Sequence, residues 1–277
     1  MIRSSATPSP APLAQFTEAD LCRVTAVLTD IDDTLTTEGR LPAVAYSALE
    51  RLYDAGLIVV PITGRPAGWC DMVARFWPVQ GVVGENGAFY FRYDREKKRM
   101  HRRYWKTEAE RIADAAKMAA LRDAIPAAVP GCAISADQAY READLAIDFC
   151  EDVPPLPEGA IKTIVTMFED AGAQAKVSSI HVNGWFGDYD KLTMTRTFFD
   201  EAFELDVQAA ADTVVFLGDS PNDAPMFAAF PNAVGVANVM DMADQMSAMP
   251  RYLAENRGGE GFAEFADRLL KARASAP

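Results

Sequence analysis

The sequence predicts an α/β fold in which a core domain with a parallel sheet carries a smaller, inserted α+β domain. Three observations support this prediction. Short apolar runs alternate with helix-like segments over residues 24–83, as in strand–helix–strand units. The pattern changes character over residues 106–184, where Ala-rich and Pro-rich stretches separate short strands. A buried-strand pattern then returns at residues 213–217, so the core is interrupted and afterwards completed.

The first predicted strand leads directly into a group of carboxylates. Residues 24–29 are all apolar or β-branched, which is typical of a strand buried on both faces. Asp30, Asp32 and Asp33 follow it within four residues, and such carboxylates raise one another's pKa unless a cation or several donors keep them ionised. Mg²⁺ is the simplest such cation for a site that also handles phosphate. The alternative is a plain acidic turn, because Asp is common in turns.

Two further core strands are predicted at residues 57–62 and 81–83, each preceded by a helix-like segment. The first of these helices lies between Pro42, which suits a first helical turn, and Gly56, which suits a C-terminal stop. Strand, helix and strand in succession imply a right-handed parallel crossover. The sheet is then Rossmann-like, and ligands bind at the carboxyl edge, where the loops after the strands gather. Those loops are residues 30–33, Thr63-Gly64-Arg65-Pro66 and Glu85-Asn86-Gly87.

A hairpin is predicted over residues 88–105, around a charged turn at 94–99. Residues 92–111 hold nine Lys or Arg against four acidic residues, an excess of five in an otherwise acidic chain. A solvated face is the simpler interpretation. The functional alternative is that part of this surface attracts an anionic substrate.

The predicted insert follows the hairpin and divides the core in two. We expect the core at residues 21–105 and 185–277, the insert at 106–184, and a flexible leader, rich in Ser and Pro, at 1–20. Helices and strands alternate in the insert, at residues 108–125, 145–149, 160–168 and 176–182.

A second strand end near residue 218 carries the next candidate residues. The buried strand 213–217 is followed by Gly218-Asp219-Ser220-Pro221-Asn222-Asp223. Ser220 and Asp223 have a complete structural explanation, since they form a capping box with Pro221 in the first helical turn. That explanation leaves out Asp219, which lies at a strand end as Asp30 does. A short strand at 233–236 and an amphipathic helix around residues 262–270 complete the core, after a glycine-rich turn at 258–261.

Composition excludes several classes of protein. The 277 residues are 49% hydrophobic and 24% charged, as in ordinary globular proteins. The net charge of −13 argues against nucleic acid as a partner. Four scattered cysteines without a CxxC pair indicate neither a zinc site nor a disulfide scaffold. No apolar run approaches a membrane span and no signal peptide is evident, so we expect a cytoplasmic protein with no membrane partner. Oligomeric partners are not predicted.

The strand-end residues together suit phosphoryl transfer, which needs a nucleophile, a metal ion and donors around the phosphate. Asp30 would attack, and Asp32 would protonate the leaving oxygen and then deprotonate water. Thr63 and Lys191 would hold the phosphate. Asp219, with Asp223 behind it, would complete the Mg²⁺ site.

The same residues resemble the four ordered motifs of the haloacid dehalogenase-like phosphatase superfamily. The motifs are Asp30-Ile31-Asp32-Asp33-Thr34, Thr63 in Thr63-Gly64-Arg65-Pro66, Lys191, and Gly218 to Asp223. Asn86-Gly87-Ala88 and the position of the insert are similar to the subgroup with the larger α/β cap, subgroup IIB, which includes Cof-like, sucrose-phosphate and mannosyl-3-phosphoglycerate phosphatases. Two departures, Asp33 and Leu192, stand where relatives frequently have Gly.

The resemblance implies a role for each matching residue. Asp30 is the nucleophile and Asp32 the general acid/base. Mg²⁺ is held by Asp30, the backbone carbonyl of Asp32, and Asp219. Asp223 contacts the metal either directly or through a water molecule. Thr63, Gly64 and Lys191 belong to the phosphate site, and Asn222 contacts phosphate or substrate.

The candidates for substrate recognition are Arg65, Asn86, His181, Asn183 and Trp185. Each of the last three also has a structural interpretation. His181 could be a hydrogen-bonded strand residue, Asn183 could form a turn, and Trp185 could pack at the hinge.

The sequence thus predicts an Mg²⁺-dependent phosphatase that acts on a small phosphorylated metabolite, most simply a sugar or polyol phosphate. Two alternatives stay open. A phosphomutase or phosphotransferase would use the same aspartyl-phosphate with another acceptor. A non-catalytic binding module would keep the fold without turnover.

Overall fold

A computed structural model describes residues 9–275, which form two compact units. The first unit is built from the chain up to Pro61 and from Phe199 onward, and the second is residues 62–198. The predicted insert, residues 106–184, lies wholly within the second unit. That unit also contains residues 62–105 and 185–198, which the sequence pattern predicts as parts of the core.

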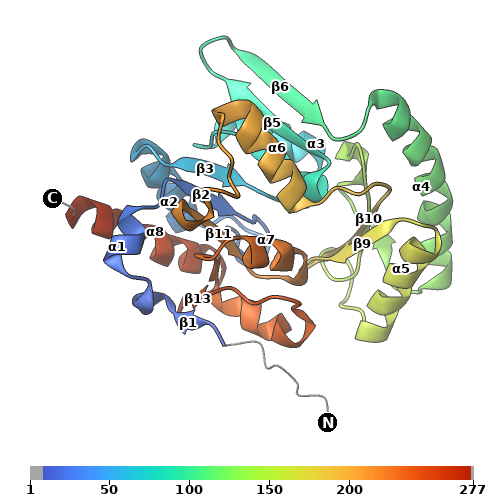
Figure 1. The fold of residues 1–277 in the computed structure, drawn as a ribbon. Coiled ribbons are helices and arrows are strands. Elements are labelled where there is room, and N and C mark those ends of the chain that lie inside the picture. The colour runs from blue at the N-terminus through green and yellow to red at the C-terminus, as the bar shows by residue number, and fades with distance from the viewer. Residues whose placement is uncertain (1–8, 276–277) are drawn as a thin grey trace. The chain divides into compact units, whose positions relative to one another are not determined.

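The first unit is organised around a six-stranded sheet whose neighbouring strands are all parallel (Figure 1). In sheet order the strands are β1 (Ala11–Pro12), β13 (Tyr252–Leu253), β12 (Val234–Gly235), β11 (Val214–Gly218), β2 (Ala26–Thr29) and β3 (Ile58–Pro61). From the central pair β2 and β11, the chain proceeds to β3 on one side and to β12 on the other. The sheet therefore has a topological switch point between β2 and β11, where open α/β sheets bind ligands.

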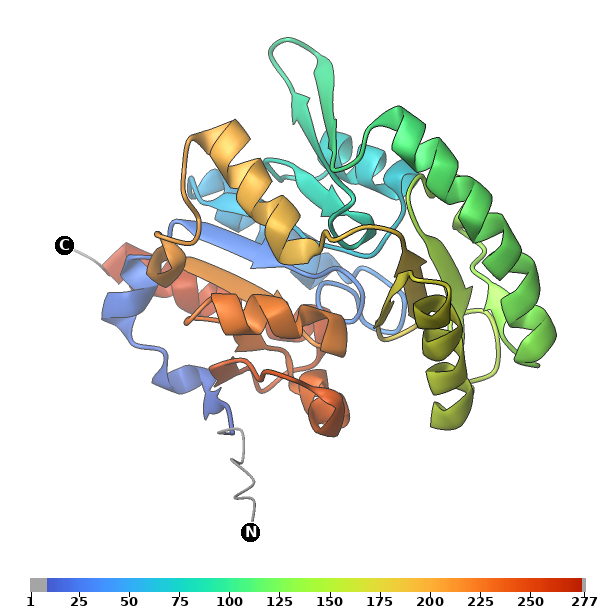
Figure 2. The same cartoon turned by 45° about the vertical axis from the view of Figure 1, so that its right-hand side comes forward.

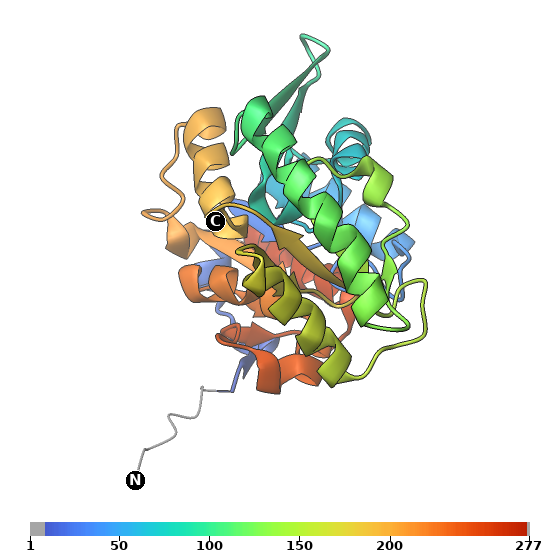
Figure 3. The same cartoon turned by 90° about the vertical axis from the view of Figure 1, so that its right-hand side faces the viewer.

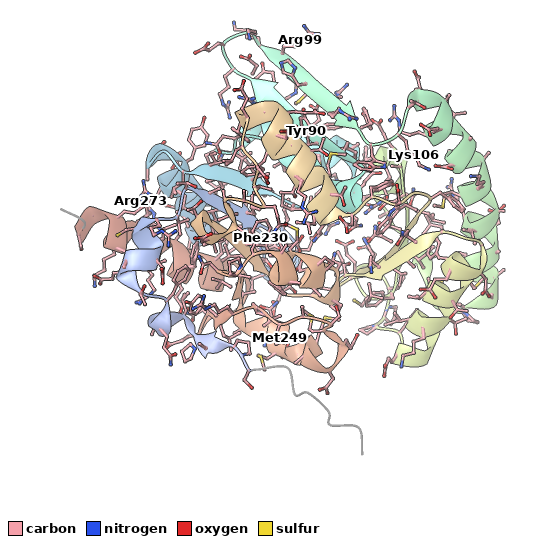
Figure 4. The ribbon with its side chains drawn as sticks, viewed as in Figure 1. Tyr90, Arg99, Lys106, Phe230, Met249 and Arg273 are labelled. Carbon is pink, nitrogen blue, oxygen red and sulfur yellow. The ribbon has the colours of Figure 1, made fainter. Side chains whose placement is uncertain are left out.

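Helices cover both faces of this sheet because the two crossovers run in opposite directions. Helix α2 (Ala43–Asp54) joins β2 to β3, and α7 (Ala224–Ala229) lies between β11 and β12 (Figure 1). Helix α8 (Gly258–Ser275) packs against α2 and against α1 (Glu18–Cys22). Phe216, Phe230 and Phe262 are fully or almost fully buried between these layers, and Figure 4 labels Phe230 among them.

The N-terminal segment differs from the flexible leader that we predicted for residues 1–20. Strand β1 pairs in parallel with β13, and Leu13 and Phe16 are buried. The Phe16 ring stacks on Tyr252 at 4.4 Å between centroids, and Arg268 Nη2 donates to the carbonyls of Ala14 and Phe16. Two isolated apolar side chains thus anchor a stretch whose Ser and Pro content suggests a leader. Residues 1–8 lie outside the described part of the chain.

The second unit contains two antiparallel sheets. The first has the order β4 (Val82–Gly84), β5 (Phe89–Asp94) and β6 (Arg99–Tyr104), and α3 (Ala67–Phe76) packs against β4 and β5. The second has the order β7 (Ala133–Ile134), β8 (Leu145–Asp148), β10 (His181–Trp185) and β9 (Gln174–Val177). Helices α4 (Glu108–Ala128) and α5 (Glu158–Asp170) run side by side over this sheet (Figures 2 and 3). Helix α6 (Lys191–Phe203) begins in this unit.

Three predicted elements take a different form in the second unit. The strand expected at 81–83 pairs antiparallel with β5 and keeps only an isolated parallel bridge, from Ile62 to Val83. The single strand expected at 176–182 is a pair of antiparallel strands, β9 and β10. Helix α4 continues through Pro126 to Ala128, beyond the predicted end. The predicted fold class is confirmed, since a parallel-sheet α/β core is interrupted by an α+β segment.

The basic hairpin has the exposed surface that the simpler interpretation expects. Most of β6 is exposed, and Figure 4 shows Arg99 near the tip of the hairpin, pointing away from the ribbon. Among the helices of residues 9–275, none combines the length and the apolar character needed to cross a bilayer.

Candidate active site

The central strands of the first unit bring two predicted site residues to one edge. Strands β2 and β11 pair in parallel, with Thr29 opposite Leu217. Asp30 follows β2, and its N–H donates to the carbonyl of Leu217 at 2.9 Å. Asp219 follows β11. Both carboxylates therefore leave the sheet at its switch point.

Three carboxylates meet there. Asp30, Asp219 and Asp223 are all buried, and one oxygen of each lies within 4.8 Å of the others. Asp223 Oδ2 accepts from the N–H groups of Asp219 (3.1 Å) and Ser220 (3.3 Å), so the capping box predicted for the 220–223 turn is present. Gly218 makes this approach possible, because a Cβ there would lie 2.5 Å from Asp223 Oδ2. The capping role and a place in the carboxylate cluster are thus compatible for Asp223.

The electrostatics of Asp219 show that this cluster suits a cation. Burial raises the pKa of Asp219 well above its usual range, and so do the negative charges of the neighbouring aspartates, Asp223 first and then Asp30 and Asp33. Thr34 Oγ1 donates to Oδ1 at 3.0 Å and Asn238 Nδ2 to Oδ2 at 3.1 Å, but both donors are neutral. A buried set of carboxylate oxygens is the donor set of a hard divalent cation.

The other predicted residues of the first unit lie close to this cluster in sequence but differ in setting. Asp32 is partly exposed and is not among the three clustered carboxylates. Asp33 has a φ of 54°, in the left-handed region that favours Gly and that Asp tolerates better than most residues. This explains how Asp33 can occupy a position where the resemblance leads us to expect Gly. Asn222 is buried, and its Oδ1 accepts from Ser220 Oγ at 2.8 Å.

Asn238 is a site residue that the sequence did not reveal. Its Nδ2 donates to Asp219 Oδ2 and, at 2.9 Å, to the Asp33 carbonyl. Its Oδ1 accepts from the N–H of Gly258, the first residue of α8, at 3.0 Å. One side chain therefore links the loop after β2, the carboxylate cluster and the C-terminal helix. It lies in a 3-10 segment without a recognisable motif, so only the structure identifies it.

The start of α8 itself lies close to the loop after β2. A Cβ on Gly258 would lie 2.5 Å from the Thr36 carbonyl, and one on Gly259 would lie 2.6 Å from the Leu35 carbonyl. The glycine-rich turn expected at 258–261 is thus the first turn of the helix, where small residues allow close contact with the active-site loop.

In the second unit, three loops with predicted phosphate or substrate residues converge. Thr63 is buried, its Oγ1 accepts from the Arg65 N–H at 3.0 Å, and its carbonyl accepts from the Asn86 N–H at 3.1 Å. A Cβ on Gly64 would lie 3.1 Å from Asn86 Nδ2. A Cβ on Gly87 would overlap the Asp190 carbonyl and lie 3.0 Å from the Lys191 nitrogen, so Gly is required there. Lys191 is buried at the start of α6.

The candidate recognition residues are also in the second unit, within a network of charges. Arg65 Nη2 donates to Glu151 Oε1 at 2.7 Å, and its guanidinium lies 4.4 Å from the centre of the Trp69 ring. His181 Nε2 lies 2.9 Å from Glu151 Oε2. Asn183 Nδ2 donates to Asp144 Oδ2 at 2.8 Å. Trp185 is almost completely buried and donates to the Tyr189 carbonyl, as expected for packing at the end of β10.

Replacing Glu151 by Gln is expected to lower the free energy of unfolding at neutral pH, and to do so less as the pH falls. Burial raises the pKa of Glu151, but the close contacts with His181 and Arg65 outweigh it and lower the pKa to about 2. A lowered pKa stabilises the fold above the unfolded-state value of 4.5, and this stability is lost as the pH falls toward about 2. Since the side chain is 27% exposed, solvent screening reduces the effect at neutral pH to about 1 kcal/mol.

Urea unfolding of both proteins between about pH 6 and about pH 3 measures this dependence. Glu158→Gln is the matched control, because Glu158 is exposed and its ion-pair partner, Lys162, is exposed as well. A stability difference that stays constant over the whole pH range would contradict the assignment.

Comparison with known proteins gives a family match for part of the chain and a shared fold for most of it. Residues 27–145 match the sequence profile of the haloacid dehalogenase-like hydrolase family. No curated protein sequence matches the chain.

Solved structures share the fold over most of the chain. Thermoplasma acidophilum 0175 has a TM-score of 0.65 at 16% identity, covering 89% of this chain and 98% of its own. The sucrose-phosphatase from Synechocystis sp. PCC6803, solved with sucrose and phosphate, has a TM-score of 0.61 at 15% identity. The match covers 88% of this chain and 97% of the sucrose-phosphatase chain. The HAD subclass IIB sugar phosphatase BT4131 has a TM-score of 0.55 at 15% identity, and the match covers 83% of this chain and 93% of the BT4131 chain. At such low sequence identities, the structural likeness establishes the fold alone.

Proposed function

Residues 27–145 match the haloacid dehalogenase-like hydrolases, and from this premise we propose that the protein is a member of that family, an Mg²⁺-dependent phosphatase acting on a small phosphomonoester. The observation that carries the proposal is the buried cluster of Asp30, Asp219 and Asp223 at the switch point of the sheet. Such a cluster is costly in a protein without a cation to bind, and it follows the same strand ends as the nucleophile and metal motifs of the family.

Asp30 and Asp32 carry the chemical steps of the proposal. A carboxylate oxygen of Asp30 attacks phosphorus and forms an O–P bond, while the bond from phosphorus to the leaving oxygen breaks and Asp32 gives that oxygen its proton. Water then attacks the aspartyl-phosphate, Asp32 takes a proton from it, and the Asp30 carboxylate is regenerated as phosphate leaves. Partial exposure of Asp32 suits a group that exchanges a proton with the leaving group and with water.

Asp30, the Asp32 carbonyl and Asp219 would hold Mg²⁺, with Asp223 as a further ligand or as the acceptor that fixes the Asp219 and Ser220 backbone. A bound Mg²⁺ would supply positive charge that screens the phosphate oxygens from these carboxylates. Thr34 and Asn238 orient Asp219 from the protein side.

Thr63 and Lys191 are the proposed phosphate ligands, with Gly64 leaving room for the ligand and Asn222 as an additional contact. Thr63 follows strand β3, the neighbour of β2, by two residues. Phosphate needs donors and positive charge around its oxygens, and a hydroxyl, backbone N–H groups and an ammonium provide them. Arg65 and Asn86 are proposed to contact the leaving group or the phosphate from adjacent loops.

The substrate class we propose is a sugar or polyol phosphate. Two proteins with this fold are described as phosphatases of sugars, and one was solved with sucrose and phosphate. The side chains near Arg65 include the carboxylates of Asp137 and Glu151, with the imidazole of His181 beside Glu151. Such groups hydrogen-bond hydroxyls well.

Phosphate release from a panel of sugar, polyol and nucleotide monophosphates and a generic aryl phosphate tests the proposal, with Mg²⁺ and with EDTA. We expect Mg²⁺-dependent release, greatest for the sugar or polyol phosphates. Phosphate moving to a second sugar without release would indicate a phosphomutase or phosphotransferase. Absence of both reactions, with folded protein and metal present, would favour the binding-module alternative.

A further inference from the structure

A fully buried carboxylate, Glu85, ties two separate segments of the second unit together. Its Oε1 accepts from the N–H of Ala67 at 2.9 Å, at the start of α3. The same carboxylate accepts from three consecutive N–H groups of another segment: Glu142 at 2.9 Å, Ala143 at 2.6 Å and Asp144 at 3.2 Å. The segment 142–144 leads into β8 of the insert, whereas Ala67 follows the Thr63–Arg65 loop. Glu85 thus fixes both main chains with one side chain.

Arg141 makes the reciprocal connection. Its guanidinium is 1% exposed and donates from Nη1 to the carbonyl of Gly64 at 2.9 Å. Nε and Nη2 donate to the two carboxylate oxygens of Asp137, at 2.9 and 3.1 Å. Nη1 also donates to the carboxylate of Asp144, whose two oxygens lie 3.0 and 3.1 Å away. A side chain of the insert therefore holds the main chain of the Thr63–Arg65 loop, while Glu85 holds the main chain of the insert.

The loop from Thr63 to Ala67 is consequently fixed at both ends. Arg141 binds the Gly64 carbonyl and Glu85 binds the Ala67 N–H. The Arg65 guanidinium between them is also restrained, with Nη1 3.4 Å from Asp137 Oδ2 and Nη2 2.7 Å from Glu151 Oε1. Every one of these contacts comes from outside the loop.

An arrangement of this kind is more than is needed for stability. Buried ion pairs are often no better for stability than well-packed apolar groups of the same volume, because each ion loses its hydration. What a planar guanidinium and a carboxylate with several N–H donors provide is a single, defined geometry. The two connections are directed at the loop that carries Thr63.

We propose that Glu85 and Arg141 are positioning residues that fix the phosphate-binding loop 63–67 from the insert. The inference rests on the proposed function, because that function assigns Thr63 the role of holding phosphate. Neither side chain touches substrate in this proposal; each acts through the backbone of Gly64 or Ala67.

Arg141→Lys tests the inference, because it keeps the charge and loses the fork that reaches three acceptors at once. We expect hydrogen exchange of the 63–67 amides to accelerate about 10-fold or more, and inhibition by inorganic phosphate to weaken by a similar factor. The half-saturating Mg²⁺ concentration should stay as in the wild type. Arg122→Lys, an exposed position on α4, is the matched control and should change neither readout.

Exchange and inhibition that match the wild type in folded Arg141→Lys would overturn the inference. If Arg141→Lys does not fold, Glu85→Gln replaces it in the same two assays, since the amide keeps the volume but has one acceptor oxygen for four N–H donors. Faster exchange of the loop there supports the inference, and wild-type exchange overturns it. The exchange measurement needs no turnover, so it remains decisive even if the wild type releases no phosphate and the proposed function fails.

Discussion

Asp30→Asn is expected to abolish phosphate release while leaving the protein folded. Loss of a catalytic nucleophile typically lowers kcat by about 10⁴-fold or more, because an amide oxygen neither attacks phosphorus effectively nor forms the covalent intermediate. The fold should survive, since Asn has the shape of Asp and the substitution removes one of three crowded negative charges. Initial rates with the best substrate of the panel, together with circular dichroism and urea unfolding, measure both parts of this expectation.

Asp54→Asn is the matched control for this experiment. Asp54 is exposed at the last turn of α2, so the same chemical change should leave kcat unaffected. Wild-type activity in Asp30→Asn would remove Asp30 from the role of nucleophile and with it the aspartyl-phosphate mechanism.

Asp219→Asn is expected to change stability in opposite directions with and without metal. In EDTA the variant should be more stable than the wild type by on the order of 1 kcal/mol, because the repulsion that raises the pKa of Asp219 is gone. With Mg²⁺ the order should reverse, since the wild type gains binding energy that the variant lacks. The half-saturating Mg²⁺ concentration for activity should rise by about 100-fold.

The pH dependence of the metal-free proteins provides an independent check. In the folded wild type Asp219 retains a proton above pH 3.8, the ordinary value, where the unfolded chain has released it. Folding therefore binds protons, and the free energy of unfolding falls as the pH rises from that value toward the raised pKa. The slope should be smaller in Asp219→Asn. Equal stability of the two proteins in EDTA at every pH would contradict the electrostatic account of the cluster.

Sequence reasoning located the parts of this site that follow from local patterns. A buried strand followed at once by carboxylates predicts a polar site at a sheet edge, and this applies to Asp30 after β2 and to Asp219 after β11. Parallel strands place their carboxyl ends at one edge of the sheet, so a common edge could be expected without coordinates. The direct pairing of β2 with β11 comes from the structure. The capping box at Ser220 and Asp223 was predictable because its two members lie three residues apart.

Contacts between distant single residues were not predictable in this way. Glu85 and Arg141 are separated by more than 50 positions, and each stands in a segment with no periodic or motif signal that names its partner. The same holds for Asn238, whose role depends on where the chain returns after β12. The single strand expected at residues 176–182 follows from an alternating pattern of polar and apolar residues, which does not reveal the turn that separates β9 from β10.

Helix α8 has a consequence for how this protein can be recombined with its relatives. Its first turn contacts the carbonyls of Leu35 and Thr36 through glycines, and its first N–H group holds Asn238 against Asp219. Chimeras that exchange this helix alone would join a new first turn to an unmatched loop and, through Asn238, disturb Asp219 of the carboxylate cluster. Residues 33–37, Asn238 and the start of α8 should therefore be transferred as one module, although they are far apart in the sequence.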